Sequence, residues 1–324
     1  MRLATHGMGL ATRGADTRDG ALIVVSEDGT RCLPAGTVAV TLQAALDDWQ
    51  SVEPHLLALA RRLDAGEGEA LDIAALLAPL PRAWQWLDGS AFPTHGELMQ
   101  RAFNSPPHTG DRPLMYQGMS HRFLSAIEDV PLPSEADGID FEGEFGVVTD
   151  DVPMGCSAAD ALAHVRLIVL INDWSLRTIA PIEMKTGFGW VQAKPACSVA
   201  PFAVTPDALG DGWREGRVCL PLRVEINGQW FGHPNGAAMA VGFHDLIAHA
   251  ALTRDLPAGT IIGSGTVSNV DHETVGSTCL SERRAIEMID HGTPRTSFLS
   301  FGDRVTMTVA PFGRIDQRVV AARR

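Results

Sequence analysis

The chain has 324 residues, a formal net charge of −13, an apolar fraction of 45% and a charged fraction of 20%. These proportions are ordinary for a folded protein and exclude an intrinsically disordered one. We expect no nucleic-acid partner, because binding to phosphates requires a basic surface that an acidic chain does not offer.

Residues 1–78 are predicted to form a small N-terminal domain that contains β-strands. Short β-like runs occupy Ala21–Val25 and Gly36–Val40, with a glycine-containing turn between them. A helical pattern follows from Leu42 to about Leu63. A segment rich in glycine and glutamate and a short apolar helix that ends at Pro79 complete this part.

Residues 79–324 are predicted to form one larger, β-rich domain of mixed α/β type. One helix is expected from Ser157 through Val165 and another over Phe243–Leu252. The predicted strands are Phe145–Val148, Ile168–Ile171, Leu220–Ile226, Thr260–Gly263 and Arg304–Val309. Short strands with irregular spacing and few helices between them favour an antiparallel or mixed sheet over a doubly wound one.

The cysteines and the apolar segments indicate the compartment. Five cysteines are scattered along the chain and never spaced as C-x-x-C, which favours a reducing compartment and argues against a disulfide framework or a zinc knuckle. The apolar runs are far shorter than the roughly 20 residues that cross a bilayer. Residues 1–7 lack the pattern of a signal peptide. We therefore expect a cytoplasmic protein without a membrane partner.

An acidic triplet, Glu142-Gly143-Glu144, is the first candidate functional site. In a strand, residues two apart lie on one face, roughly 7 Å from each other. Two ionised carboxylates at that separation repel each other unless a cation lies between them. A solvated strand face is the alternative, but the apolar neighbours Phe141 and Phe145 argue against it.

Asp173 is the second candidate, because it directly follows the aliphatic run that ends at Ile171. A charge in that position must be paired, cap a helix or bind a metal. The helix-cap alternative stays open, since residues 174–179 could begin a helix. Carboxylate oxygens are hard ligands that suit Mg²⁺, Mn²⁺ or Ca²⁺ and not zinc.

Five segments of this chain, in the same order, resemble the fumarylacetoacetate hydrolase family over roughly residues 80–310. They are Phe141-Glu142-Gly143-Glu144, Asn172-Asp173-Trp174-Ser175-Leu176-Arg177, Ala193-Lys194-Pro195, Gly263-Ser264-Gly265-Thr266-Val267-Ser268 and Phe301-Gly302-Asp303-Arg304-Val305. The resemblance implies a β-roll-like catalytic domain and a homodimer. It also implies a divalent metal, Mg²⁺ first and Mn²⁺ or Ca²⁺ as alternatives, held by Glu142, Glu144 and Asp173.

The resemblance extends upstream to two further residues of the predicted site. Members of the fumarylacetoacetase type carry a metal-binding aspartate and, seven residues later, a general-base histidine; Asp88 and His95 have that spacing. A loop histidine is the alternative for His95. Tyr116, the only tyrosine, stands where the family has a tyrosine that contacts substrate. A half-buried aromatic with its hydroxyl in water is the alternative reading.

Four more residues complete the predicted site. Glu282 corresponds to a family carboxylate that orients the histidine; a register two residues earlier and a surface ion pair are the alternatives. Lys194 could stabilise developing negative charge, and Arg177 could bind an anionic substrate. Thr266, in a glycine-rich turn, offers a hydroxyl and backbone N–H groups to a carboxylate. Surface cations and a plain turn are the alternatives for these three.

The resemblance implies hydrolysis of a carbon–carbon bond in a small anionic diketo acid, fumarylacetoacetate or a related acylpyruvate, through a metal-stabilised enolate. His95, oriented by Glu282, would take a proton from the attacking water. A 2-oxo acid decarboxylase, isomerase or hydratase on the same scaffold is the alternative. Ala180 and Met184 stand where fumarylacetoacetases have a glutamine and a tyrosine, so the substrate stays open.

Overall fold

A computed structural model describes residues 1–7, 18–104, 110 and 112–323, which form a mixed α/β, sheet-rich fold. The 11 strands of the main sheet are, in spatial order, β4 (Glu69–Ala70), β3 (Arg31–Pro34), β2 (Ala21–Val25), β1 (Arg2–His6), β13 (Ala203–Val204), β10 (Val165–Asn172), β9 (Gly143–Thr149), β18 (Ile261–Gly263), β5 (Trp86–Gly89) and β6 (Met115–Gly118), with β12 (Ser198–Val199) paired to β10. The mixed, β-rich class expected from the sequence is confirmed.

Three smaller sheets and eight helices accompany the main sheet in the described part of the chain. The five-stranded sheet has the order β17 (Gln229–Gly232), β16 (Arg223–Ile226), β19 (Arg304–Val309), β20 (Gly313–Ala321) and β7 (Val130–Leu132). The two-stranded sheets pair β11 (Ser175–Leu176) with β8 (Ile139–Asp140), and β14 (Trp213–Arg214) with β15 (Arg217–Val218). The helices are α1 (Leu42–Asp47), α2 (Trp49–Asp64), α3 (Pro93–Phe103), α4 (Ala158–Ala161), α5 (Ala180–Met184), α6 (Phe243–Ala250), α7 (His272–Val275) and α8 (Leu280–His291).

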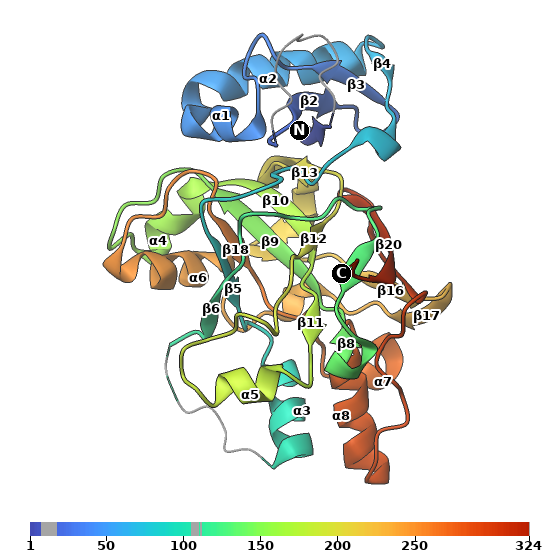
Figure 1. Cartoon of the computed structure of the whole chain (residues 1–324). Coiled ribbons are helices and arrows are strands. Elements are labelled where there is room, and N and C mark those ends of the chain that lie inside the picture. Colours follow the sequence, from blue (N-terminus) through green and yellow to red (C-terminus); the bar gives the residue numbers. More distant parts are fainter. Residues whose placement is uncertain (8–17, 105–109, 111, 324) are drawn as a thin grey trace.

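The N-terminal elements gather at one end of the molecule, and α3, α5 and α8 lie at the other (Figure 1). The N-terminal strands nevertheless continue the main sheet, because β1 pairs with β13 and β13 pairs with β10. The boundary between residues 78 and 79 stays a prediction.

Strand β10 is buried on both faces and separates two apolar clusters. Its Ile168 and Leu170 belong to the core of the larger part, predicted as residues 79–324, beside β9 and α6. Alternate residues of the same strand, such as Val169, belong to a second cluster together with Trp49 and Leu56 of α2. A strand covered on both faces is expected to read as a continuous aliphatic run, which explains the sequence of this segment.

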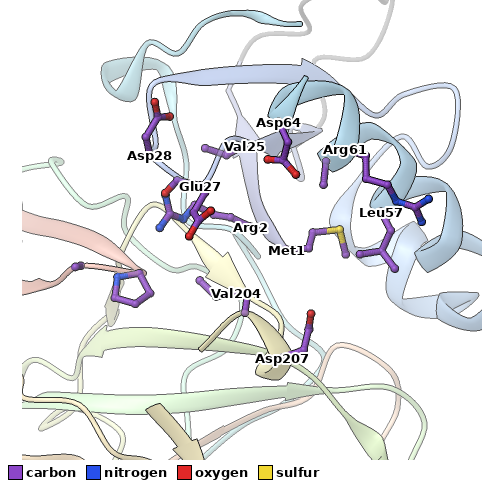
Figure 2. Close-up of a pocket in the computed structure, with 14 residues that line it drawn as sticks. Met1, Arg2, Val25, Glu27, Asp28, Leu57, Arg61, Asp64, Val204 and Asp207 are labelled. Atoms are coloured by element: carbon purple, nitrogen blue, oxygen red, sulfur yellow. The ribbon is translucent and has the colours of Figure 1, made fainter. Parts of the chain in front are cut away.

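A cavity of about 650 Å³ lies where the N-terminal elements meet the larger part of the molecule (Figure 2). Arg2, Glu27 and Asp64 line it from the N-terminal side, and Val204 and Asp207 line it from the opposite side. The guanidinium of Arg2 is already engaged, because it donates hydrogen bonds to the backbone oxygens of residues 26 and 27.

Local differences from the sequence expectations have identifiable causes. The single helix expected from Leu42 is two helices, because Asp48 takes a non-helical backbone conformation between α1 and α2. Residues 36–40 form a turn instead of a strand, since the N–H groups of Val38 and Ala39 both donate to the carbonyl of Ala35. No helix in the described ranges is long and apolar enough to cross a membrane.

Candidate active site

Three strands of the main sheet bring three carboxylates to one place. Asp88 lies in β5, Glu144 lies in β9, and Asp173 directly follows β10. The pairing of β9 with β10 places Glu144 opposite Ile171, two residues before Asp173. Strand β18 connects β9 to β5 and aligns Gly263 with Asp88. Ser175–Leu176 is a strand, so the residues that follow Asp173 do not begin the helix that was its alternative reading.

These three carboxylates form a group that could hold a divalent metal. One oxygen of each lies within 4.8 Å of the others, and all three side chains are buried. Among the described residues, none donates a hydrogen bond to either oxygen of Glu144, and the carboxylate of Asp88 lies beside it. Burial, and then the charge of Asp173, raise the pKa of Asp88 to about 8. Burial and the charge of Asp88 also raise the pKa of Glu144 well above its usual range. A hard cation bound by these oxygens would stabilise their ionised forms and so lower both raised pKa values.

Two glycines let the backbone approach Asp88 closely. A β-carbon at Gly263 would lie 2.3 Å from Asp88 Oδ1, so a side chain there would displace the carboxylate. The N–H of Gly265, which has a φ of +77°, donates to the same oxygen at 3.1 Å. The glycine-rich turn therefore fixes the orientation of this carboxylate.

Glu142, also predicted as a metal ligand, faces the same cavity but is bound by two cations. Lys194 Nζ lies 2.8 Å from Glu142 Oε2 and 2.6 Å from Asp173 Oδ2, and Arg177 pairs with the other oxygen of Glu142. Burial acts to raise the pKa of Glu142, but the charges of Arg177 and Lys194 outweigh it and hold that pKa below its usual range. Burial likewise acts to lower the pKa of Lys194, but Asp173 and Glu142 outweigh it and raise that pKa. Glu142 and Lys194 are therefore both charged.

Asp140 is a site residue that the sequence did not reveal. Its carboxylate accepts hydrogen bonds from the backbone N–H groups of Leu280, at 2.7 Å, and Ser281, at 2.9 Å, at the start of α8. It also accepts one from Arg177 Nε at 2.8 Å. Asp140 thereby links Arg177 to the helix that carries Glu282. In the sequence it stands two residues before Glu142 and continues the alternation of Glu142 and Glu144, a spacing that could have marked it as a candidate but not its contacts with α8.

The structure brings together His95 and Glu282, which are 187 residues apart in the sequence. Nδ1 of His95 in α3 lies 3.0 Å from Oε2 of Glu282 in α8, and the carboxylate is fully buried. The two helices pack through a small apolar cluster that includes Leu98, Ala285 and Ile286. The packing fixes the separation of the pair. A buried carboxylate on Nδ1 orients the ring and leaves Nε2 for acid–base chemistry.

Two aromatic residues, Tyr116 and Trp190, line the cavity of about 330 Å³ that contains this site. The hydroxyl of Tyr116 donates to Asp173 Oδ2 at 2.6 Å, and the ring contacts Trp190 edge to face at 4.9 Å between centroids. Thr266 is buried and lines the cavity. The thiol of Cys197, which the sequence did not reveal, donates to Asp173 Oδ1 at 3.1 Å. Asp173 is therefore held from both of its oxygens.

All ten residues predicted for the site thus lie at one cavity. Eight of them line it. Asp173 is bonded to the lining residue Lys194, and Glu282 is paired with the lining residue His95. Arg177, predicted to bind substrate, makes its ion pairs with Asp140 and Glu142. The site combines several hard oxygen ligands with a fixed ammonium group and an oriented imidazole. Such a set can stabilise an enolate and move a proton at a neighbouring water.

Comparisons with known proteins agree with the fold. A family model described as "Fumarylacetoacetate (FAA) hydrolase C-terminal" matches residues 85–320, and one described as "Fumarylacetoacetase N-terminal domain 2" matches residues 8–82. The chain is 26% identical over 161 residues to the mitochondrial oxaloacetate tautomerase Fahd2a of Rattus norvegicus, covering 49% of each chain. It is 28% identical over 161 residues to the 2,4-didehydro-3-deoxy-L-rhamnonate hydrolase of Sphingomonas sp. (strain SKA58), covering 49% of this chain and 54% of that protein.

The chain spans about half the length of these curated relatives. A solved structure of maleylpyruvate hydrolase from Sphingobium sp. SYK-6, in complex with manganese(II) ion and pyruvate, has a TM-score of 0.68 at 16% identity and covers 100% of both chains. That likeness shows a shared fold. The family matches confirm the resemblance carried by the five sequence segments.

Proposed function

Because the chain belongs to the fumarylacetoacetate hydrolase family, we propose that it is a metal-dependent enzyme that hydrolyses a carbon–carbon bond in a small diketo acid. The proposed substrate is fumarylacetoacetate or a related acylpyruvate. One observation carries the proposal: the buried carboxylate group and the His95–Glu282 pair belong to the same site. The family includes hydrolases, isomerases and tautomerases, and an oriented base beside an enolate-stabilising site suits hydrolysis.

The residues present fit a divalent metal, since Asp88, Glu144 and Asp173 offer buried oxygen ligands and Glu144 has two unpartnered oxygens. We propose Mg²⁺, with Mn²⁺ or Ca²⁺ as alternatives. Glu142 is the fourth proposed ligand, and its ion pairs with Arg177 and Lys194 hold it at the site. When bound, the cation supplies Lewis-acid stabilisation of the enolate oxygen.

The chain's own groups carry the proton transfers. His95, held by Glu282, removes a proton from water, and the oxygen of that water adds to the carbonyl carbon of the acyl group. The bond between this carbon and the central carbon then breaks, and the electron pair passes to the pyruvate part as its enolate. Lys194 lies where it can stabilise that charge. Protonation of the central carbon completes the conversion of one diketo acid and one water into two acids.

An enol–keto tautomerase, isomerase or decarboxylase acting on a 2-oxo acid is the second candidate. The relative from Rattus norvegicus, named as an oxaloacetate tautomerase, favours it. The same carboxylates would stabilise the same type of enolate, but no water would be consumed. We further propose that the protein is a cytoplasmic homodimer and that it binds a small anionic substrate.

An assay with Mg²⁺ or Mn²⁺ across fumarylacetoacetate and a panel of acylpyruvates tests the proposal. Hydrolysis predicts loss of the diketo-acid absorbance with formation of pyruvate, or of acetoacetate from fumarylacetoacetate, and of one further acid. Absorbance loss without a second acid would instead identify a tautomerase. No change in any of these substrates, in protein shown to bind Mn²⁺, would refute the proposed hydrolysis.

A further inference from the structure

We propose that this site selects an acylpyruvate whose acyl group ends in an uncharged, apolar carbon chain. Of the substrates proposed above, the site would therefore disfavour fumarylacetoacetate, whose acyl group ends in a second carboxylate. The inference rests on the proposed function, because it concerns the substrate class of the same cavity.

The cavity is polar at its floor and mainly apolar at its rim, where the exposed Ser90 contributes one uncharged hydroxyl. The floor contains Asp88, Glu144 and Lys194, whose exposed fractions are 5%, 0% and 6%. The rim contains Leu114 and Met184, whose exposed fractions are 50% and 63%. A 2-oxo acid group that reaches the buried carboxylates and their metal would therefore leave the acyl end among apolar side chains.

The positive charges of the cavity are confined to its floor and are already shared. Among the described residues that line it, the permanently charged cations are Lys194 and Arg177. Lys194 lies between Glu142 and Asp173, and Arg177 lies between Glu142 and Asp140. Each therefore meets two carboxylates before any substrate arrives, so neither is left to bind a distal carboxylate.

A second carboxylate on the substrate would also face an unfavourable charge balance. Four carboxylates line the cavity or its floor against two cations, and the chain has a net charge of −13. A divalent metal would offset the repulsion at the 2-oxo acid end, where it binds. At the rim a carboxylate would lose water to the side chains of Leu114, Met115 and Met184 without gaining a hydrogen-bond donor from them. An alkyl end of the same length would instead bury apolar surface there.

A matched pair of substrates tests this preference. Butanoylpyruvate and succinylpyruvate have acyl groups of equal carbon number and differ in a terminal methyl against a terminal carboxylate. With the Mn²⁺-loaded protein, kcat/KM should favour butanoylpyruvate by about tenfold or more. Equal values, or a preference for succinylpyruvate, would overturn the proposal.

Binding of uncleavable analogues separates this inference from the proposed reaction. 2-Oxohexanoate and 2-oxoadipate have the same difference at their ends but lack the second carbonyl that hydrolysis requires. Calorimetry with the Mn²⁺-loaded protein should show tighter binding of 2-oxohexanoate. If that preference holds while no acylpyruvate is cleaved, the reaction is wrong and the apolar subsite stands. If acylpyruvates are cleaved without any preference in either pair, the reaction stands and the apolar subsite is refuted.

A charge placed at the rim should reverse the preference. Met184→Arg should raise kcat/KM for succinylpyruvate relative to butanoylpyruvate, because the new guanidinium would face the distal carboxylate. Met154→Arg is the matched control, since Met154 is equally exposed, at 62%, and does not line the cavity. Lys185 follows α5 and lies outside the lining, and it is the cation whose contribution to the rim must be tested. A wild-type preference for succinylpyruvate that Lys185→Gln abolishes would show that Lys185 supplies a cation to the rim, and the proposal would be wrong.

Discussion

Metal binding at the carboxylate group should release protons and therefore strengthen steeply with pH. The pKa of Asp88 is about 8, so this group is neutral in most metal-free molecules at pH 7, whereas a metal binds the ionised form. With one such proton, the ionised fraction rises from about 1% at pH 6 to half at pH 8, and the affinity rises about fiftyfold. The raised pKa of Glu144 would add to the slope and not reduce it.

Isothermal titration with Mn²⁺ between pH 6 and pH 9 measures this slope, and buffers of different ionisation enthalpy count the protons released. Asp88→Asn should bind more weakly and show a slope smaller by about one proton. Affinity that stays constant from pH 6 to pH 8, without proton release, would refute the reasoning. The metal-free protein should show the opposite trend in stability. The contribution of neutral Asp88 is complete below pH 3.8 and is lost as the pH rises through about 8.

Three substitutions test other parts of the site. His95→Ala should lower kcat by about 10²–10⁴ with nearly unchanged Mn²⁺ affinity, while His164→Ala, which removes another half-buried histidine paired with a carboxylate, should leave kcat unchanged; loss of metal binding would make His95 a ligand instead. Gly263→Ala should weaken Mn²⁺ binding in calorimetry, because a β-carbon would lie 2.3 Å from a ligand oxygen, and wild-type affinity would contradict the proposed orientation. Arg177→Met should lower the free energy of unfolding in urea by about 3 kcal/mol, because it removes a cation from two buried carboxylates and leaves Glu142 with Lys194 and Asp140 with backbone N–H groups. The exposed ion pair lost in Arg223→Met should contribute only about 0–1 kcal/mol, and equal losses in the two variants would argue against a buried network.

Local sequence signals were sufficient where one segment decides the outcome. The aliphatic run that ends before Asp173 predicted a buried strand followed by a charge that needs a partner, and the structure has both. Two helices that carry site residues were not predicted, although signals existed. Pro93 is the first residue of α3, a favoured helix position, and Gly292 ends α8 with a φ of +77°.

Other features could not be read from any local pattern. The register of Glu282 stayed open in the sequence, because the position of a residue on α8 relative to α3 depends on how the two helices pack. Asp140 and Cys197 act on the site through contacts between segments that are distant in the sequence. The carboxylate partners of Arg177, Asp140 and Glu142, lie in a different segment, so the sequence did not reveal these ion pairs.

The position of β10 between two apolar clusters has a consequence for substitutions far from the site. The strand delivers Asp173, and one of its faces is held by side chains of the N-terminal helices, such as Trp49. A cavity opened in that distant cluster would give β10 freedom to shift, and the shift would reach the carboxylate at its end. Substitutions in the N-terminal part should therefore alter the affinity for the metal without contacting it. The packing of the N-terminal part thus limits how precisely β10 positions Asp173.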